Sequence, residues 1–159
     1  MDILSALHTV AYPRGVYSAR VDDKGRLKLP TDFQHYLLAL GETKVFITSL
    51  DERIARIYPI SIWKANEKIL RTSTDSEAAD DLSFTANDLG SDGEMDSQGR
   101  LTLKTELRQT LGLGNQQVFL EHSRGHIKFY NEQVHEERRA RARENRAVKL
   151  KALEDQGLL

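Results

Sequence analysis

Apolar and polar residues alternate in two short stretches of this chain, and a tight turn interrupts each stretch. The first alternation covers residues 15–21 and continues at 26–29 after the turn. The second has apolar Met95 before its turn and alternates over residues 100–103 after it. Alternation with period two on both sides of a glycine-containing turn is typical of a β-hairpin. The pattern therefore predicts two hairpins of the same kind.

The turns repeat as well as the strands. In each copy an apolar residue and an Asp are followed by polar residues, Gly-Arg and then Leu-x-Leu. Asp22 or Asp23, and Asp96, are placed to accept hydrogen bonds from turn amides, and Gly25 and Gly99 can adopt a positive φ. We expect these Asp and Gly residues to be structural.

The same order of elements follows each hairpin. Thr31 and Thr105 are placed to cap short helices, and Pro59 is placed to begin a longer one. The expected helices span 32–40, 106–111 and 59–70, and the expected strands span 45–48, 54–58, 117–121 and 127–130. Apolar Trp63, Tyr58 and Tyr130 are interpreted as packing residues.

These elements predict an α+β, strand-dominated fold. At 159 residues, two separate bodies of half the length would each be marginal, so we expect two tandem units in one pseudo-symmetric body. The expected organisation is an N-terminal extension (1–13), a first repeat with its connecting helix (14–70), an acidic linker with one weak helical stretch (71–92), a second repeat (93–131) and a C-terminal charged helix and tail (132–159).

The C-terminal segment is expected to be one helix of about twenty residues that begins after Asn131 and lies mostly in solvent, because its large apolar residues are few. The spacings of Glu137 with Arg141 and of Glu136 with Arg139 predict intrahelical ion pairs. A solvated face is favoured over DNA contact for this basic helix.

Composition adds one asymmetry. The formal net charge is only -1, yet residues 75–96 carry eight carboxylates and no Lys or Arg, whereas basic residues outnumber acidic ones over 132–151. The chain has no cysteine, no recognisable signal peptide in residues 1–10 and no apolar run of membrane-spanning length. We expect a cytoplasmic protein without disulfides or thiolate chemistry.

The arginines after the two turn glycines are not needed for turn formation. Arg26 and Arg100 either form a surface ion pair with the Asp of their own turn, or are held by that Asp so that the guanidinium meets a phosphate or a guanine edge. Lys24, Lys28 and Arg14 make the first copy the more basic one. If nucleic acid binds, we expect these five residues to contact it.

The repeated motif resembles that of a known family. The chain is similar to the MraZ family of bacterial transcriptional regulators, which consist of two AbrB-like swapped-hairpin barrel domains, over roughly residues 14–137. The matching positions are Arg14-Gly15, Asp22 to Arg26, Leu29-Pro30, Pro59 followed by Trp63, and Asp96 to Arg100. The acidic 75–94 run and the extension 1–13 depart from the family pattern.

The resemblance implies a ring-forming homo-oligomer that binds direct repeats in double-stranded DNA, at the promoter of the division and cell-wall gene cluster, and is nucleoid-associated. It also implies that Arg26 is the residue most tied to DNA contact. The alternative is an antitoxin-like AbrB-type module whose main partner is another protein, held by the C-terminal segment.

Other chemistry has little support in the sequence. The 88–99 segment lacks the Asp or Asn and the Glu that an EF-hand requires at its third and twelfth positions, and His122 with His126 has no evident third metal ligand. No nucleophile motif or phosphate-binding loop occurs. We therefore expect no enzyme activity, no metal, no cofactor, no small-molecule ligand and no membrane partner.

Overall fold

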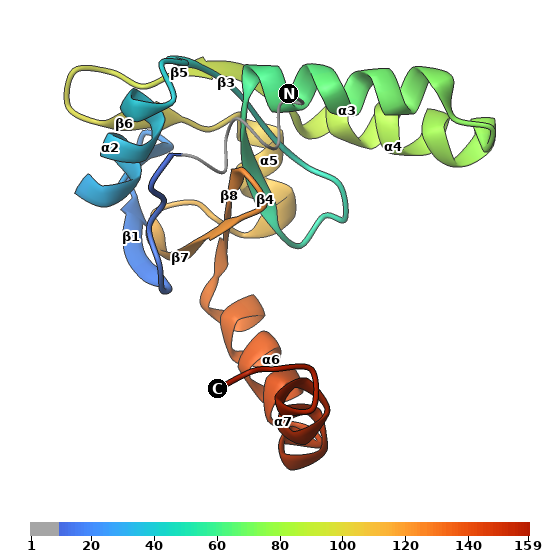
Figure 1. The fold of residues 1–159 in the computed structure, drawn as a ribbon. Helices are drawn as coiled ribbons and strands as arrows, with labels where there is room; N and C mark the ends of the chain where they lie inside the picture. The colour runs from blue at the N-terminus through green and yellow to red at the C-terminus, as the bar shows by residue number, and fades with distance from the viewer. Residues whose placement is uncertain (1–9) are drawn as a thin grey trace.

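Eight strands of this chain form one antiparallel sheet in the order β5-β3-β4-β8-β7-β1-β2-β6 in the computed structural model, which describes residues 10–159 (Figure 1). The sheet curls so that its end strands β5 and β6 approach each other, giving a nearly closed barrel. The strands are β1 (Tyr17–Val21), β2 (Arg26–Lys28), β3 (Lys44–Ser49), β4 (Ala55–Pro59), β5 (Ser91–Glu94), β6 (Arg100–Thr102), β7 (Gln116–Ser123) and β8 (His126–Asn131). Most of the expected N-terminal extension, residues 1–9, lies outside the described residues.

The two repeats exchange strands. β1 of the first repeat pairs with β7 of the second, and β5 of the second repeat pairs with β3 of the first. The remaining cross-repeat pairs, β2 with β6 and β4 with β8, join equivalent strands. This arrangement confirms the predicted strand-rich α+β body of two intertwined units, and neither unit has a complete sheet without the other.

Equivalent leucines from the two repeats meet inside the barrel. Leu27 lies directly opposite Leu101 on the β2–β6 pair, and both side chains are fully buried. Helices α2 (Thr31–Ala39) and α5 (Thr105–Leu111) cover the barrel and contribute buried Phe33 and Leu107. One core therefore serves both repeats, because each supplies side chains that the other buries.

The predicted threonine caps are wrong by one residue. Pro30 and Lys104 occupy the N-cap positions, neither makes a side-chain capping bond, and Thr31 and Thr105 are the first helical residues. The φ of Pro30, -56°, already suits a helix entry, so that helix starts directly after the proline.

The segment expected as an acidic linker folds as a helix. After α3 (Ile60–Thr72), which confirms the helix predicted beyond Pro59, the chain turns back as α4 (Ser76–Leu89). Asp75 caps α4 by accepting a hydrogen bond from the amide of Ala78 at 3.1 Å. The side chain of Thr48 on β3 donates to the carbonyl of Ala86 at 2.7 Å. Small apolar residues on α4 thus allow it to pack on the barrel. The sequence did not predict this contact because carboxylates dominate the hydropathy pattern of the segment.

The C-terminal segment forms two helices instead of one. α6 (Glu132–Arg143) begins at Asn131, whose side chain accepts from the amide of Val134 as predicted. Asn145 takes a left-handed conformation with φ 52° and separates α6 from α7 (Arg146–Glu154). Neither helix has a buried residue, which confirms a solvent-exposed segment. No helix in the described part of the chain is long and apolar enough to cross a membrane.

Ion pairing on α6 differs in part from the prediction. Arg139 pairs with Glu136 at 3.7 Å as expected, but Glu137 pairs with Arg53 of the β3–β4 loop and not with Arg141. The contact with Arg53 anchors the base of α6 to the barrel.

The aromatic residues assigned to packing are buried. Trp63 is 5% exposed and stacks on Phe46 with ring centroids 4.7 Å apart, and Tyr58 and Tyr130 are each 3% exposed. Tyr58 also stacks on His126 at 4.7 Å. These contacts hold α3 against the barrel and confirm the packing interpretation.

Gly90 provides a stability test of the α4 to β5 junction. A Cβ on Gly90 would lie 2.3 Å from the carbonyl oxygen of Ala86 and 2.4 Å from the ring of Phe46. We therefore expect Gly90→Ala to lower the free energy of unfolding by about 1–3 kcal/mol, measured by urea titration. Gly114→Ala, where nothing lies within 4 Å of the new Cβ, is the control and should change it little. Equal unfolding midpoints for the two variants would contradict this packing.

Stability should also fall in mild acid because of His126. Burial, and next the positive charge of Arg56, lower the pKa of His126 from 6.5 to about 4. The unfolded chain then takes up the proton first, so the folded state loses stability as the pH falls below 6.5, by about 2 kcal/mol at pH 5. In His126→Gln the pH dependence between 7 and 5 should shrink, whereas the exposed His35→Gln should retain it. An unchanged slope in His126→Gln would refute the assignment.

Candidate nucleic-acid interface

The first repeated turn is held by a single carboxylate. Asp22 Oδ1 accepts hydrogen bonds from the amides of Lys24 at 3.0 Å and Arg26 at 2.9 Å, and its Oδ2 accepts from Arg26 Nε at 2.9 Å. The amide of Gly25 donates to the carbonyl of Asp22, and Gly25 has φ 78°. Asp22, not Asp23, therefore shapes the turn and fixes the arginine that follows it.

The second turn has the same geometry. Asp96 Oδ1 accepts from the amides of Gln98 and Arg100 at 2.9 Å each, and its Oδ2 accepts from Arg100 Nε at 2.9 Å. Gly99 has φ 75°. In both turns an Asp thus accepts two backbone amides and an arginine Nε, and a glycine has a positive φ.

The two turns interlock through their glycines. The carbonyl of Gly99 accepts from the amide of Leu29 at 2.9 Å, and the carbonyl of Gly25 accepts from the amide of Leu103 at 2.8 Å. A Cβ on Gly25 would meet the guanidinium of Arg108 at 2.5 Å, and one on Gly99 would meet the side-chain amide of Gln34 at 2.2 Å. Glycine is therefore favoured at both positions chiefly by the positive φ, because the Arg108 and Gln34 side chains of the facing repeat could move away from a new Cβ.

β2 and β6 are the last two strands of the sheet, and the outer face of this pair, here called the ribbon, carries both motif arginines. Arg26 lies opposite Thr102, and Lys28 lies opposite Arg100, on either side of the buried Leu27–Leu101 pair. Because side chains alternate along a strand, these four residues share the face that points away from the core. Arg26 and Arg100 are diagonal neighbours on the two strands, and the Cα atoms of such residues are typically about 7–8 Å apart. We call the outer face formed by Arg26, Lys28, Arg100 and Thr102 the ribbon face.

The ion pairs leave part of each guanidinium available. Asp22 and Asp96 engage the Nε atoms, and the terminal nitrogens of both arginines make no hydrogen bond within the described residues. The side chains of Arg26 and Arg100 are 29% and 24% exposed. Hydrogen bonds from the arginine amide and then from its side chain lower the pKa of each Asp, so both carboxylates remain ionised at neutral pH. Each arginine is thus held at one end and free at the other.

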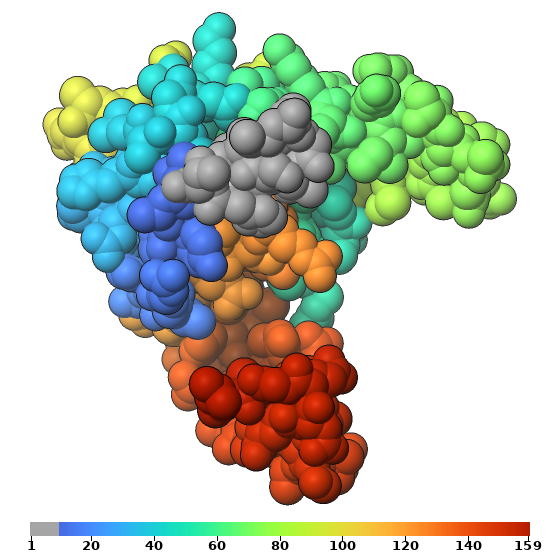
Figure 2. Space-filling model, in the orientation of Figure 1, coloured from blue at the N-terminus to red at the C-terminus, as the bar shows by residue number. Residues whose placement is uncertain are grey.

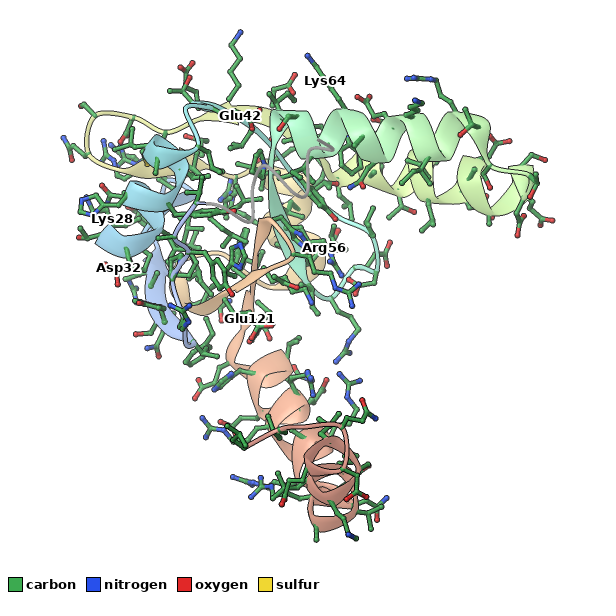
Figure 3. The ribbon with its side chains drawn as sticks, in the orientation of Figure 1. Lys28, Asp32, Glu42, Arg56, Lys64 and Glu121 are labelled. Carbon is green, nitrogen blue, oxygen red and sulfur yellow. The ribbon has the colours of Figure 1, made fainter. Side chains whose placement is uncertain are left out.

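The other predicted contact residues are placed differently. Lys24 is exposed in the first turn, and Lys28 Nζ donates to the carbonyl of Gln98 in the second turn. Figure 3 shows Lys28 at the edge of the body opposite the α3–α4 hairpin. Arg14 lies before β1, at the end of that strand remote from the turn, with its guanidinium 5.3 Å from the ring centroid of Tyr12. The structure therefore brings Lys24, Arg26, Lys28 and Arg100 together and leaves Arg14 apart.

Thr102 was missed as a member of this face. Side chains on a strand alternate between its two faces, so Thr102, two residues after Arg100, lies on the same outer face as Arg100. Its hydroxyl is a potential donor or acceptor between the two arginines.

Comparison with known proteins agrees with this architecture. No protein-family model matches the chain. It is 39% identical over 98 residues to the transcriptional regulator MraZ of Acidobacterium capsulatum, an alignment that covers 61% of this chain and 67% of that protein. It is 36% identical to MraZ of Koribacter versatilis over 60% of this chain and 67% of the relative, and 32% identical to MraZ of Serratia proteamaculans over 76% and 80%.

These relatives are named as regulators, which confirms the expectation that the chain is not an enzyme. The chain belongs to the MraZ family of transcriptional regulators.

Proposed function

We propose that this protein is a sequence-specific DNA-binding transcriptional regulator, and that the ribbon face enters the major groove. A two-stranded β-ribbon fits the width of that groove. The observation that carries the proposal is the pair of arginines on one exposed face, each held through Nε by an Asp of its own turn. A fixed guanidinium with free terminal nitrogens can donate two hydrogen bonds to a guanine edge or a phosphate.

Positioning matters because a flexible arginine loses side-chain entropy when it binds. The Asp bonds remove much of that loss before DNA arrives, so more of the contact energy contributes to affinity. Lys24 adds positive charge beside the first turn and would contact the backbone. Arg14, which lies apart from the ribbon, would reach only a flanking phosphate.

A single ribbon offers few basic groups, and the chain has a net charge of -1. We propose that the protein self-associates into a ring whose subunits each present one ribbon to one of several direct repeats. Weak contacts then add through high effective concentration. The family resemblance points to the promoter of the division and cell-wall gene cluster as the site, and so to a nucleoid-associated protein.

Removal of either motif guanidinium should weaken DNA binding. We expect Arg26→Ala and Arg100→Ala each to cost about 1–3 kcal/mol of binding free energy per ribbon and to reduce the salt slope by about one per lost phosphate contact. The measurement is fluorescence anisotropy with DNA from upstream of the protein's own gene, at several salt concentrations. Arg71→Ala, which removes an exposed arginine from α3, is the control. Wild-type affinity in both motif variants would exclude the ribbon face as the contact surface.

A second substitution separates positioning from simple charge. Asp22→Asn removes a negative charge next to the DNA but weakens the bond that holds Arg26. If Asp22 positions the guanidinium, the ratio of specific to non-specific affinity should fall about fivefold or more, a loss of about 1 kcal/mol, while non-specific binding is unchanged or stronger. Both affinities are measured in parallel on operator and scrambled duplexes. An equal rise in both would show that Asp22 only reduces attraction to DNA.

A further inference from the structure

α4 carries an exposed acidic stripe with an aromatic residue at its centre. Glu77, Asp81, Phe84 and Asp88 are spaced by four, three and four residues, which places them on one side of the helix. Phe84 is 69% exposed. We call these four residues the α4 stripe. A large aromatic side chain left in water among carboxylates indicates a surface that another molecule covers.

The stripe points away from the body of its own chain. The side of α4 that packs on the barrel carries Ala79, Ala86 and Leu89, which are all buried. Phe84 lies two residues from Ala86, so about 200° of helix rotation separates the two side chains. Lys104, just before α5, donates to the backbone carbonyl of Asp88 at 2.9 Å at one end of the stripe, while Glu77, Asp81, Phe84 and the Asp88 side chain remain exposed. The α3–α4 hairpin projects from the barrel (Figure 1).

The second projecting element is the arm formed by α6 and α7. Neither helix buries a residue, and Val148, Leu150 and Leu153 of α7 are 72%, 48% and 50% exposed. A helix as short as the nine residues of α7 is marginal in water without tertiary contacts. In Figure 2 the arm extends from the rest of the molecule and leaves most of its surface open. The arm therefore also needs a partner.

The two surfaces have opposite charges. Residues 75–94 contain seven carboxylates and no Lys or Arg, whereas residues 138–151 contain seven Arg or Lys and one Glu. Each surface combines its charges with exposed apolar side chains, Phe84 on one and the α7 residues on the other. The two opposite charges nearly cancel, so the net charge of the chain is only -1.

We propose that the α6–α7 arm of one copy docks on the α4 stripe of a second copy. Leu150 and Leu153, which share one side of α7 with Arg146 and Lys149, would cover Phe84, while the two basic residues would face the carboxylates on either side of it. The arm and the α3–α4 hairpin leave the barrel in different directions, so an arm does not reach the stripe of its own chain (Figure 1). This inference rests on the proposed self-association and is independent of DNA binding.

A contact between two different surfaces of the same chain is heterologous. Such contacts produce a closed ring when the rotation between copies closes and a filament when it does not. The arm and the stripe therefore provide the kind of contact that the proposed ring needs, and they leave every ribbon face uncovered.

Charge reversal on full-length protein without DNA tests the docking, with molar mass measured by light scattering after gel filtration. Asp81→Lys/Asp88→Lys changes the stripe, and Arg146→Glu/Lys149→Glu changes the arm, all at exposed positions. We expect each variant to fall to the 18.1 kDa of one chain. The charge-matched control Asp23→Lys/Glu52→Lys, on two loops, should keep the wild-type assembly.

Two combinations make the test specific. All four substitutions in one chain should restore assembly, because the reversed charges again match. In an equimolar mixture of the two double variants, the intact arm matches the intact stripe and the reversed arm matches the reversed stripe, so the mixture should assemble although neither variant does so alone. Phe84→Ala should lower the mass without a change in the urea midpoint.

The outcomes separate this inference from the proposed function. Wild-type mass in both double variants, or a mixture that stays monomeric, would overturn the docking. A wild-type chain that is monomeric at all concentrations would also overturn it and would leave the arm for a different protein. In each case, Arg26-dependent binding to DNA with a single repeat would show that the proposed DNA contact still holds.

Discussion

The interlocking of the two turns is the constraint on which the rest of the structure depends. The carbonyls of Gly25 and Gly99 each accept an amide of the opposite repeat, and these bonds flank the buried Leu27–Leu101 pair. Neither repeat can complete its sheet or its core alone. The same contact sets the two motif arginines on one outer face, so folding and the formation of the ribbon face are a single event. A regulator that had not folded would present no paired arginines to DNA.

The chain distributes its charge by element. The ribbon face is basic, α4 is acidic and the α6–α7 arm is basic again. Arg26 and Arg100 offset the charges of Asp22 and Asp96, so these two carboxylates repel DNA less. The carboxylates of α4 lie on a hairpin that projects from the barrel. Since exposed charges more than about 8–10 Å apart are screened at physiological ionic strength, such separation lets one nearly neutral chain keep a locally basic surface.

Local patterns predicted much of the fold, and they failed where packing overrode local signals. The strands, the repeat and the helix after Pro59 follow from periodicity and from proline and glycine positions. α4 was underestimated because its carboxylates suggested a linker, while its three small or apolar contacts are too few to dominate a hydropathy pattern. The break at Asn145 was missed because an Asn within a charged run gives no strong stop signal.

The sequence by itself determined the duplicated turn, its Asp and Gly roles and the presence of an arginine after each, since hydrogen bonding within a turn spans only a few residues. Only the tertiary structure decided that Arg26 and Arg100 lie on one ribbon, that Arg14 lies elsewhere and that Thr102 joins the face. Those outcomes depend on the register between strands about seventy residues apart in the chain, and that register follows from burying Leu27 against Leu101.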